Sequence, residues 1–293
     1  CAIIECRGGE VPTVREVQAE MVAAEVARLC QEANYDLPGD VLECLRAALE
    51  REESPAGREV LEQLLENARI AAQERVPMCQ DTGSAVVFLE VGQEVHVTGG
   101  NLYDAVNEGV RRGYREGYLR KSIVEHPWKR KNTGDNTPAV IHAEVVPGDR
   151  LKVVVAPKGG GSENMSALKM LNPSDGREGV RRFVVETVSR AGPNPCPPVV
   201  VGVGVGGSFE KAAYLAKRAL LRELGLHHPD PGVAELEREL LEDLNRLGIG
   251  PQGFGGRVTA LWVAVELFPT HIASLPVAVN INCHAARHRE AVL

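Results

Sequence analysis

Three of the seven cysteines lie in irregular segments where a thiol could bind a metal. Cys79 occurs in the segment PMCQDTG, Cys196 in GPNPCPP and Cys283 in INCHAARH. Proline fixes φ and removes a backbone donor, so the proline-rich segments predict thiols on stiff, non-repeating backbone that suits a ligand. A free cysteine beside a strand is also typical of a small buried hydrophobe, and no CxxC pair of the kind found in zinc sites is present. Spacing alone therefore leaves both interpretations open. The other cysteines are interpreted as structural or incidental: Cys1, Cys6, Cys30 and Cys44.

Groups that could bind or transform an anion accompany these cysteines. Asp81 follows Cys79 by two residues, although Asp-Thr-Gly is also a common turn sequence. Residues Gly159–Gly161 form a loop whose backbone N–H groups could approach an anion closely, or a simple turn between strand and helix. Arg120 could bind a carboxylate through two parallel hydrogen bonds. The nearby Lys129-Arg130-Lys131 run is typical of a solvated surface.

Four motifs occur in a fixed order along the chain: PMCQDTG from Pro77, KNTGDNTP from Lys131, KGGGSEN from Lys158 and NCHAARH from Asn282. Together they resemble the α subunit, or N-terminal part, of class I (iron–sulfur) fumarate hydratases and the related L(+)-tartrate dehydratases. The resemblance extends from about Thr13 to Leu293. It implies that Cys79, Cys196 and Cys283 hold a [4Fe–4S] cluster with one iron left open, and that the enzyme is oxygen-sensitive.

The same resemblance implies the roles of further residues. A Lewis-acidic iron would stabilise the negative charge of the hydroxyl oxygen, while side chains move the proton at the neighbouring carbon. The remaining site is expected to consist of catalytic Asp81 and His271, with Gln80, Arg120, Gly160 and Gly161 binding substrate. From the residues alone, a single histidine such as His271 is more often structural.

The expected reaction is the reversible hydration of fumarate to L-malate in the tricarboxylic acid cycle, and dehydration of L(+)-tartrate is the alternative. Single-chain members of this family continue beyond the position of Leu293. We therefore expect an α subunit that needs a separate β subunit, in an α2β2 heterotetramer. The α chain alone is expected to have little activity.

Two other functions compete with this interpretation. The glycine-rich stretch VGVGVGG at Val201–Gly207 resembles a dinucleotide-binding loop, although the G-x-G-x-x-G pattern is only partly met. No acidic residue ending a second strand follows about 20 residues later, as that motif requires. A non-catalytic iron–sulfur scaffold or redox sensor is the second alternative. Such a protein would not need an acid, an arginine and a glycine loop around its thiols.

Composition restricts the class of protein. The chain has 293 residues, of which 44% are hydrophobic and 25% charged, as in an ordinary globular protein. The net charge of −7 argues against general nucleic-acid binding, which needs a basic surface. No apolar run reaches the ~20 residues that span a bilayer, and no secretory signal is recognisable, so a cytoplasmic location is expected. Residues 1–12 are interpreted as an extension and residues 13–293 as a single domain.

These groups must be positioned by helices and strands. The pattern of expected helices and strands indicates a mixed α/β fold with a helical N-terminal layer, but it does not define the sheet topology. A capping box formed by Thr13 and Glu16 predicts the first helix. Residues 139–146 and 151–156, separated by Pro147-Gly148-Asp149, predict a β-hairpin. Further helices are expected at residues 38–49, 57–74, 101–119, 176–191, 209–224 and 233–247, and further strands at residues 84–91, 199–205, 259–267 and 273–281.

Overall fold

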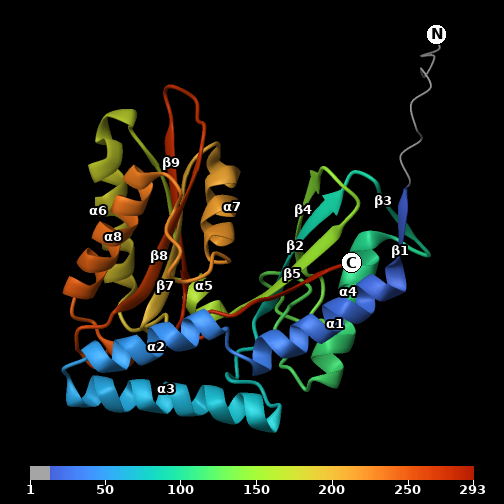
Figure 1. Cartoon of the computed structure of the whole chain (residues 1–293), viewed down its shortest axis with the longest axis horizontal. Helices are drawn as coiled ribbons and strands as arrows, with labels where there is room; N and C mark the ends of the chain where they lie inside the picture. The colour runs from blue at the N-terminus through green and yellow to red at the C-terminus, as the bar shows by residue number, and fades with distance from the viewer. Residues whose placement is uncertain (1–13) are drawn as a thin grey trace. The chain divides into compact units, whose positions relative to one another are not determined.

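The computed structural model describes residues 14–293 and shows the predicted mixed α/β fold (Figure 1). Its contacts divide the described chain into two compact units. One contains the residues up to 30, 85–155 and 289–293, and the other contains residues 31–84 and 156–288. The predicted extension over residues 1–12 lies outside the described residues, and the single domain stays a prediction. Within residues 14–293, no helix is long and apolar enough to cross a membrane.

The second unit contains a four-stranded sheet in the order β6-β9-β7-β8. Strands β7 (Val199–Gly206) and β8 (Ala260–Phe268) are parallel, whereas β9 (Leu275–Asn282) runs antiparallel to β7. Strand β6 (Ala167–Leu171) completes the sheet against β9. Because β7 is buried along both faces, it reads as a nearly continuous run of valine and glycine rather than an alternating pattern.

Helices cover both faces of this sheet (Figure 1). Helices α6 (Gly176–Ala191) and α8 (Pro231–Arg246) pack on the valines of one face, and α7 (Phe209–Ala219) packs on the other. On the α7 side, Gly202 and Gly204 stand where a Cβ would collide with backbone carbonyl oxygens of α7. These glycines lie inside the strand and allow close helix packing. They do not form a phosphate-binding loop, which removes the basis of the dinucleotide-binding interpretation.

Two further helices of this unit lead towards Cys79. Helix α2 (Gly39–Arg51) pairs with α3 (Pro55–Glu74), whose N-cap Ser54 accepts a hydrogen bond from Gly57 N. Their buried leucines form a core with β8. Helix α3 ends at Arg75 in the left-handed conformation, which turns the chain into the Cys79 segment. The shorter elements of this unit are α5 (Gly160–Glu163) and the 3-10 helices Pro173–Asp175 and Pro251–Gly253.

The first unit holds a second four-stranded sheet, in the order β10-β5-β2-β4. Helix α4 (Leu102–Glu116) belongs to the same unit and is capped by Asn101. Helix α1 (Ala19–Tyr35) begins in this unit. The remaining strands are β1 (Arg15–Gln18), β2 (Ser84–Gly92), β3 (Val95–Thr98), β4 (Val140–Val146), β5 (Leu151–Lys158) and β10 (Arg289–Val292).

The structure corrects the predicted start of the first helix. Glu16 does not join a capping box but lies in β1, where it pairs with His96 of β3, and Thr13 lies outside the described residues. The helix begins only at Ala19. Parallel pairing with a strand distant in sequence satisfies the backbone of Arg15–Gln18, and this pairing outweighs the local helix signal.

The predicted hairpin is also wrong. Strands β4 and β5 follow each other in sequence, but β2 lies between them and is parallel to β4. The end of β2 is held by both flanking segments, because Gly92 N donates to Arg150 O at 2.8 Å and Gln93 N donates to Val146 O at 2.8 Å. The other predicted helices and strands are present, with bounds that differ by a few residues.

Candidate functional site

Three separate loops bring Cys79, Cys196 and Cys283 together within the second unit. Cys196 lies three residues before the start of β7, and Cys283 immediately follows β9. Because these strands are antiparallel, the two loops meet at one end of the sheet. Burial raises the pKa of the Cys196 thiol most, and the neighbouring Cys283 and Cys79 raise it further. Cys79 and Cys283 therefore both lie near Cys196.

Each cysteine loop is fixed through main-chain atoms. Cys196 adopts a left-handed conformation with φ 57° between two prolines, and its carbonyl oxygen accepts a hydrogen bond from His284 N at 3.3 Å. Met78, beside Cys79, is held on both sides: its N–H donates to Asn34 O at 3.0 Å, and its carbonyl oxygen accepts from Asn67 Nδ2 at 2.8 Å. The Cys283 loop is therefore tied to the Cys196 loop, and the Cys79 loop to the helices.

Asp81 connects the Cys79 loop to the glycine loop. Its Oδ1 accepts a hydrogen bond from Gly83 N at 3.0 Å, and its Oδ2 accepts from Gly160 N at 2.7 Å. The bond to Gly83 forms the Asp-Thr-Gly turn that the sequence suggested. The bond to Gly160 joins two predicted site residues. Arg287 also donates from Nη2 to the carbonyl oxygen of Asp81 at 2.7 Å. Gln80 lies beside this turn, where its Oε1 accepts from Cys79 Sγ at 3.4 Å.

A network of charged side chains that the sequence interpretation missed contacts the glycine loop. Lys158, only 5% exposed, donates to Ser162 Oγ at 2.7 Å and lies 3.4 Å from Glu163 Oε2. Lys217 forms an ion pair with the other oxygen of Glu163 at 2.5 Å. Burial is the main cause that lowers the pKa of Lys158 to about 8, and Glu163 opposes this. The position of Lys158, at a strand end just before three glycines, was the signal that could have identified it.

Arg287 is the second buried cation near the cysteines. It is 5% exposed and follows Cys283 by four residues. Among residues 14–293, its Nε has no hydrogen-bond partner, although this atom is buried. A buried guanidinium N–H without a partner is costly, so such a group calls for an acceptor.

The structure does not bring His271 to the cysteines of the same chain. His271 lies in the turn between β8 and β9, whereas Cys283 follows the opposite end of β9. Eight strand residues at the usual rise separate these ends by about 26 Å. The His271 side chain is exposed, and its Nδ1 accepts a hydrogen bond from Ala273 N at 3.2 Å. Its catalytic role stays a prediction.

Arg120 belongs to the first unit, which is described separately. It lies in an irregular segment after α4, and its side chain is exposed. In the same segment, Ser122 N donates to Asn136 Oδ1 at 2.7 Å, and Asn132 Nδ2 donates to Lys121 O at 2.9 Å. These bonds join the backbone after Arg120 to two asparagines of the motif that begins at Lys131. Substrate binding by Arg120 stays a prediction.

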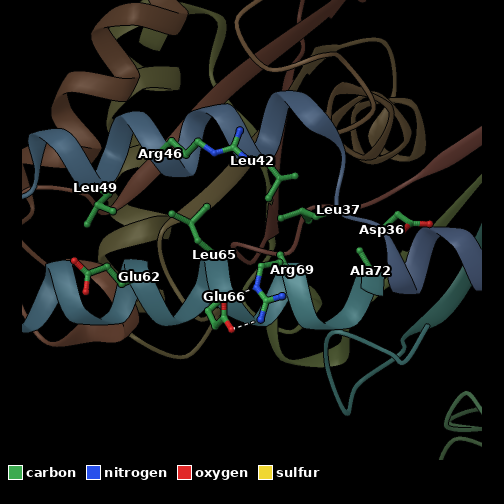
Figure 2. A pocket seen from close by; sticks show the side chains of 11 residues that line it. Asp36, Leu37, Leu42, Arg46, Leu49, Glu62, Leu65, Glu66, Arg69 and Ala72 are labelled. Carbon is green, nitrogen blue, oxygen red and sulfur yellow. Dashed lines mark hydrogen bonds and ion pairs between the residues drawn. The ribbon is translucent and has the colours of Figure 1, made fainter. Parts of the chain in front are cut away.

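A groove between α2 and α3 is lined by leucines and by charged residues at its rim (Figure 2). Arg69 and Glu66 form an ion pair there at 2.5 Å. None of the predicted site residues lines this groove. It is therefore separate from the cysteine site.

Comparisons with known proteins agree with the geometry. The model of the family described as fumarate hydratase (Fumerase) matches residues 23–292. A putative L(+)-tartrate dehydratase subunit alpha of Methanocaldococcus jannaschii is 45% identical over 89% of this chain and 94% of the relative. The L(+)-tartrate dehydratase subunit alpha of Escherichia coli K12 is 37% identical over 88% and 85%. The chain belongs to the fumarate hydratase (Fumerase) family. It is an enzyme of the hydro-lyase class.

The cysteine site of this family member offers three thiols, which are the donor type that iron–sulfur clusters use. Within residues 14–293, no three His, Cys, Asp or Glu side chains converge closely enough to hold one metal ion. A cluster does not need such convergence, because each thiolate binds a different iron atom. The three neighbouring thiols, together with the buried cations Lys158 and Arg287, suit a bound group that carries negative charge.

Proposed function

We propose that this chain is the α subunit of an iron–sulfur hydro-lyase that reversibly hydrates fumarate to L-malate. The observation that carries the proposal is the meeting of Cys79, Cys196 and Cys283, from three separate loops, beside Asp81. Three thiolates would hold a [4Fe–4S] cluster and leave one iron open. That iron would supply Lewis-acid stabilisation of the leaving hydroxide.

The residues of this chain would position the substrate and manage its protons. Asp81, held by Gly83 N and Gly160 N, would hold or release the proton near the departing oxygen. Gln80 and the backbone of Gly160 and Gly161 would face a substrate carboxylate. Arg120 would bind a carboxylate through two parallel hydrogen bonds. The family resemblance supports these roles, as does the hydrogen bond that joins Asp81 to Gly160.

L(+)-tartrate is the second candidate substrate. The relatives compared above are named L(+)-tartrate dehydratase, whereas the family description names fumarate hydratase. L-malate, the hydration product of fumarate, and L(+)-tartrate are both four-carbon dicarboxylates that bear a hydroxyl on the carbon next to an acidic C–H, so one site could process either. The relatives are named as α subunits, which also supports a separate β subunit as partner of this chain. We propose that the two subunits form an α2β2 assembly.

The test is anaerobic reconstitution of the α chain with iron and sulfide, followed by iron analysis and assays with the β subunit. We expect Cys79→Ser, Cys196→Ser and Cys283→Ser each to lose most cluster iron. Cys44→Ser is the matched control, because Cys44 is partly buried in the leucine core of α2 and α3 and should leave cluster content unchanged. Assays with L-malate and L(+)-tartrate would identify the substrate. Full cluster content in all three site variants would refute the proposal.

A further inference from the structure

One short segment contacts all three cysteine loops. In residues 158–166, Gly160 N donates to Asp81 Oδ2 of the Cys79 loop at 2.7 Å. At Gly161, a Cβ would lie 3.7 Å from Asn194 O of the Cys196 loop. Ser166 Oγ accepts from Ile281 N, two residues before Cys283, at 3.1 Å. We call residues 158–166 the cradle segment. It is the place from which one group could influence every cysteine loop.

Lys158 is the buried charge at the start of the cradle segment. Its ammonium group donates to Ser162 Oγ at 2.7 Å and lies 3.4 Å from Gly159 O, so it holds the glycine loop from below. Its backbone is also in tight contact with the Cys79 loop, because a Cβ on Gly83 would lie 2.7 Å from Lys158 N. A shift of this side chain would therefore move the glycine loop.

In the ion-pair network of Lys158, the ammonium groups outnumber the carboxylates. Two lysines, Lys158 and Lys217, share the single carboxylate of Glu163, which leaves one net positive charge. Burial of a charge is costly unless an opposite charge compensates it. Burial lowers the pKa of Lys158 to about 8, while Glu163 and Cys283 act in the opposite direction.

A bound cluster would supply the missing charge. A [4Fe–4S] core in its doubly positive form, held by three thiolates, carries one net negative charge. This equals in size the net positive charge of the Lys158–Glu163–Lys217 network. Charges near a cluster shift its reduction potential, because they stabilise one oxidation state over the other.

We infer that Lys158 is a positioning residue that holds the cradle segment against the three cysteine loops and balances the negative charge of the bound cluster. This inference rests on the proposed function for its second part only. The first part concerns the arrangement of the loops and holds for the chain without a cluster. The two parts are therefore tested separately.

The charge-balancing role of Lys158 is tested in the reconstituted α chain. The measurements are the midpoint potential of the cluster and the rate of iron release to a chelator. Lys158→Met should lower the potential and speed iron release about tenfold, equivalent to about 1.4 kcal/mol. Glu163→Gln removes a negative charge from the same network and should raise the potential. Lys169→Met, at an exposed position of β6, is the control and should change neither. Unchanged or same-direction shifts in the two network variants would overturn the charge role.

The positioning is tested in the cluster-free chain by amide hydrogen exchange. We expect Lys158→Met to speed exchange severalfold at Gly83, Gly160 and Ile281, whereas Lys169→Met leaves these amides unchanged. Ser162→Ala removes the hydrogen-bond partner of Lys158 and keeps its charge, so it serves if Lys158→Met does not fold. Wild-type exchange in the folded variants would overturn the positioning role. Failure of the wild-type chain to bind any cluster would instead refute the proposed function and leave the exchange result valid.

Discussion

Asp81 uses one carboxylate for two separate contacts, the turn to Gly83 and the bond to Gly160. The sequence offered turn and catalysis as alternatives, yet the structure makes the turn the means by which the acid is placed beside the glycine loop. The burial of Lys158 and Arg287, in contrast, could not be predicted from the sequence. Their burial depends on strands and loops far away in sequence, which no local pattern specifies.

Asp81→Asn tests the proton role of this carboxylate. Asparagine keeps one acceptor oxygen for the backbone N–H groups, but it cannot exchange a proton, so kcat should fall by about 10²–10⁴ while cluster iron stays unchanged. Steady-state assays and iron analysis of the reconstituted enzyme measure both. Asp104→Asn, at an exposed position of α4, should keep full activity. Wild-type kcat in the Asp81 variant would exclude this residue from catalysis.

The low pKa of Asp135 predicts that acid destabilises the first unit. Burial opposes its ionisation, but hydrogen bonds from Thr137 and Arg111 prevail and lower its pKa to about 2. Because the folded pKa lies below the ordinary aspartate pKa of about 3.9, this group stabilises the fold above that pH. The contribution, about 2 kcal/mol, is lost as the pH falls from about 4 to 2. Urea unfolding of the cluster-free chain should show this loss, and Asp135→Asn should remove it. Equal pH dependence in both proteins would contradict the assignment.

At the scale of elements, the long periodic segments were predicted well, and the short edge strands were not. Helix α6 and strands β7 to β9 carry strong local patterns, so the sequence located them within a few residues. Strands β1, β3, β6 and β10 are short and exist because a distant strand pairs with them. The β4–β5 hairpin failed for the same reason, since insertion of β2 between them is a long-range event.

Gly204→Ala tests the packing of α7 on β7. A Cβ there would collide with Ala212 O of the helix, so the variant should lose about 1–3 kcal/mol of unfolding free energy. Chemical denaturation of the cluster-free chain measures this loss. Gly39→Ala provides the control, because nothing lies within 4 Å of the added Cβ and its stability should hardly change. A fully stable Gly204 variant would mean that α7 can move away without cost.

At the scale of the whole molecule, the family motifs located the three cysteines, Asp81 and the glycine loop, and the second unit brings all of them together. His271 and Arg120 were chosen by resemblance too, but the first lies at the opposite end of β9 and the second in the other unit. A motif identifies a residue type at a place in the chain. Its spatial partner depends on the fold and, for a subunit, on the assembly.

The isolated α chain should therefore bind a cluster but hydrate fumarate negligibly. The described site contains an acid and a glycine loop, and we expect the β subunit to supply further cations that hold the substrate carboxylates. Addition of the β subunit should raise activity by at least a hundredfold, measured by fumarate absorbance under anaerobic conditions. Full activity of the α chain alone would disprove the need for a partner.

The hydrogen bonds that join the cysteine loops end on main-chain carbonyl oxygens. His284 N donates to Cys196 O, and the Arg287 guanidinium donates to Asp81 O. A carbonyl oxygen is present whatever side chain its residue bears, so these contacts tolerate substitution at the accepting positions. They do not tolerate a change in the number of residues. A single inserted residue between Cys283 and Arg287 would shift the guanidinium out of reach while every ligand remained in place. Natural variation should therefore leave the lengths of these loops constant even where their sequences diverge.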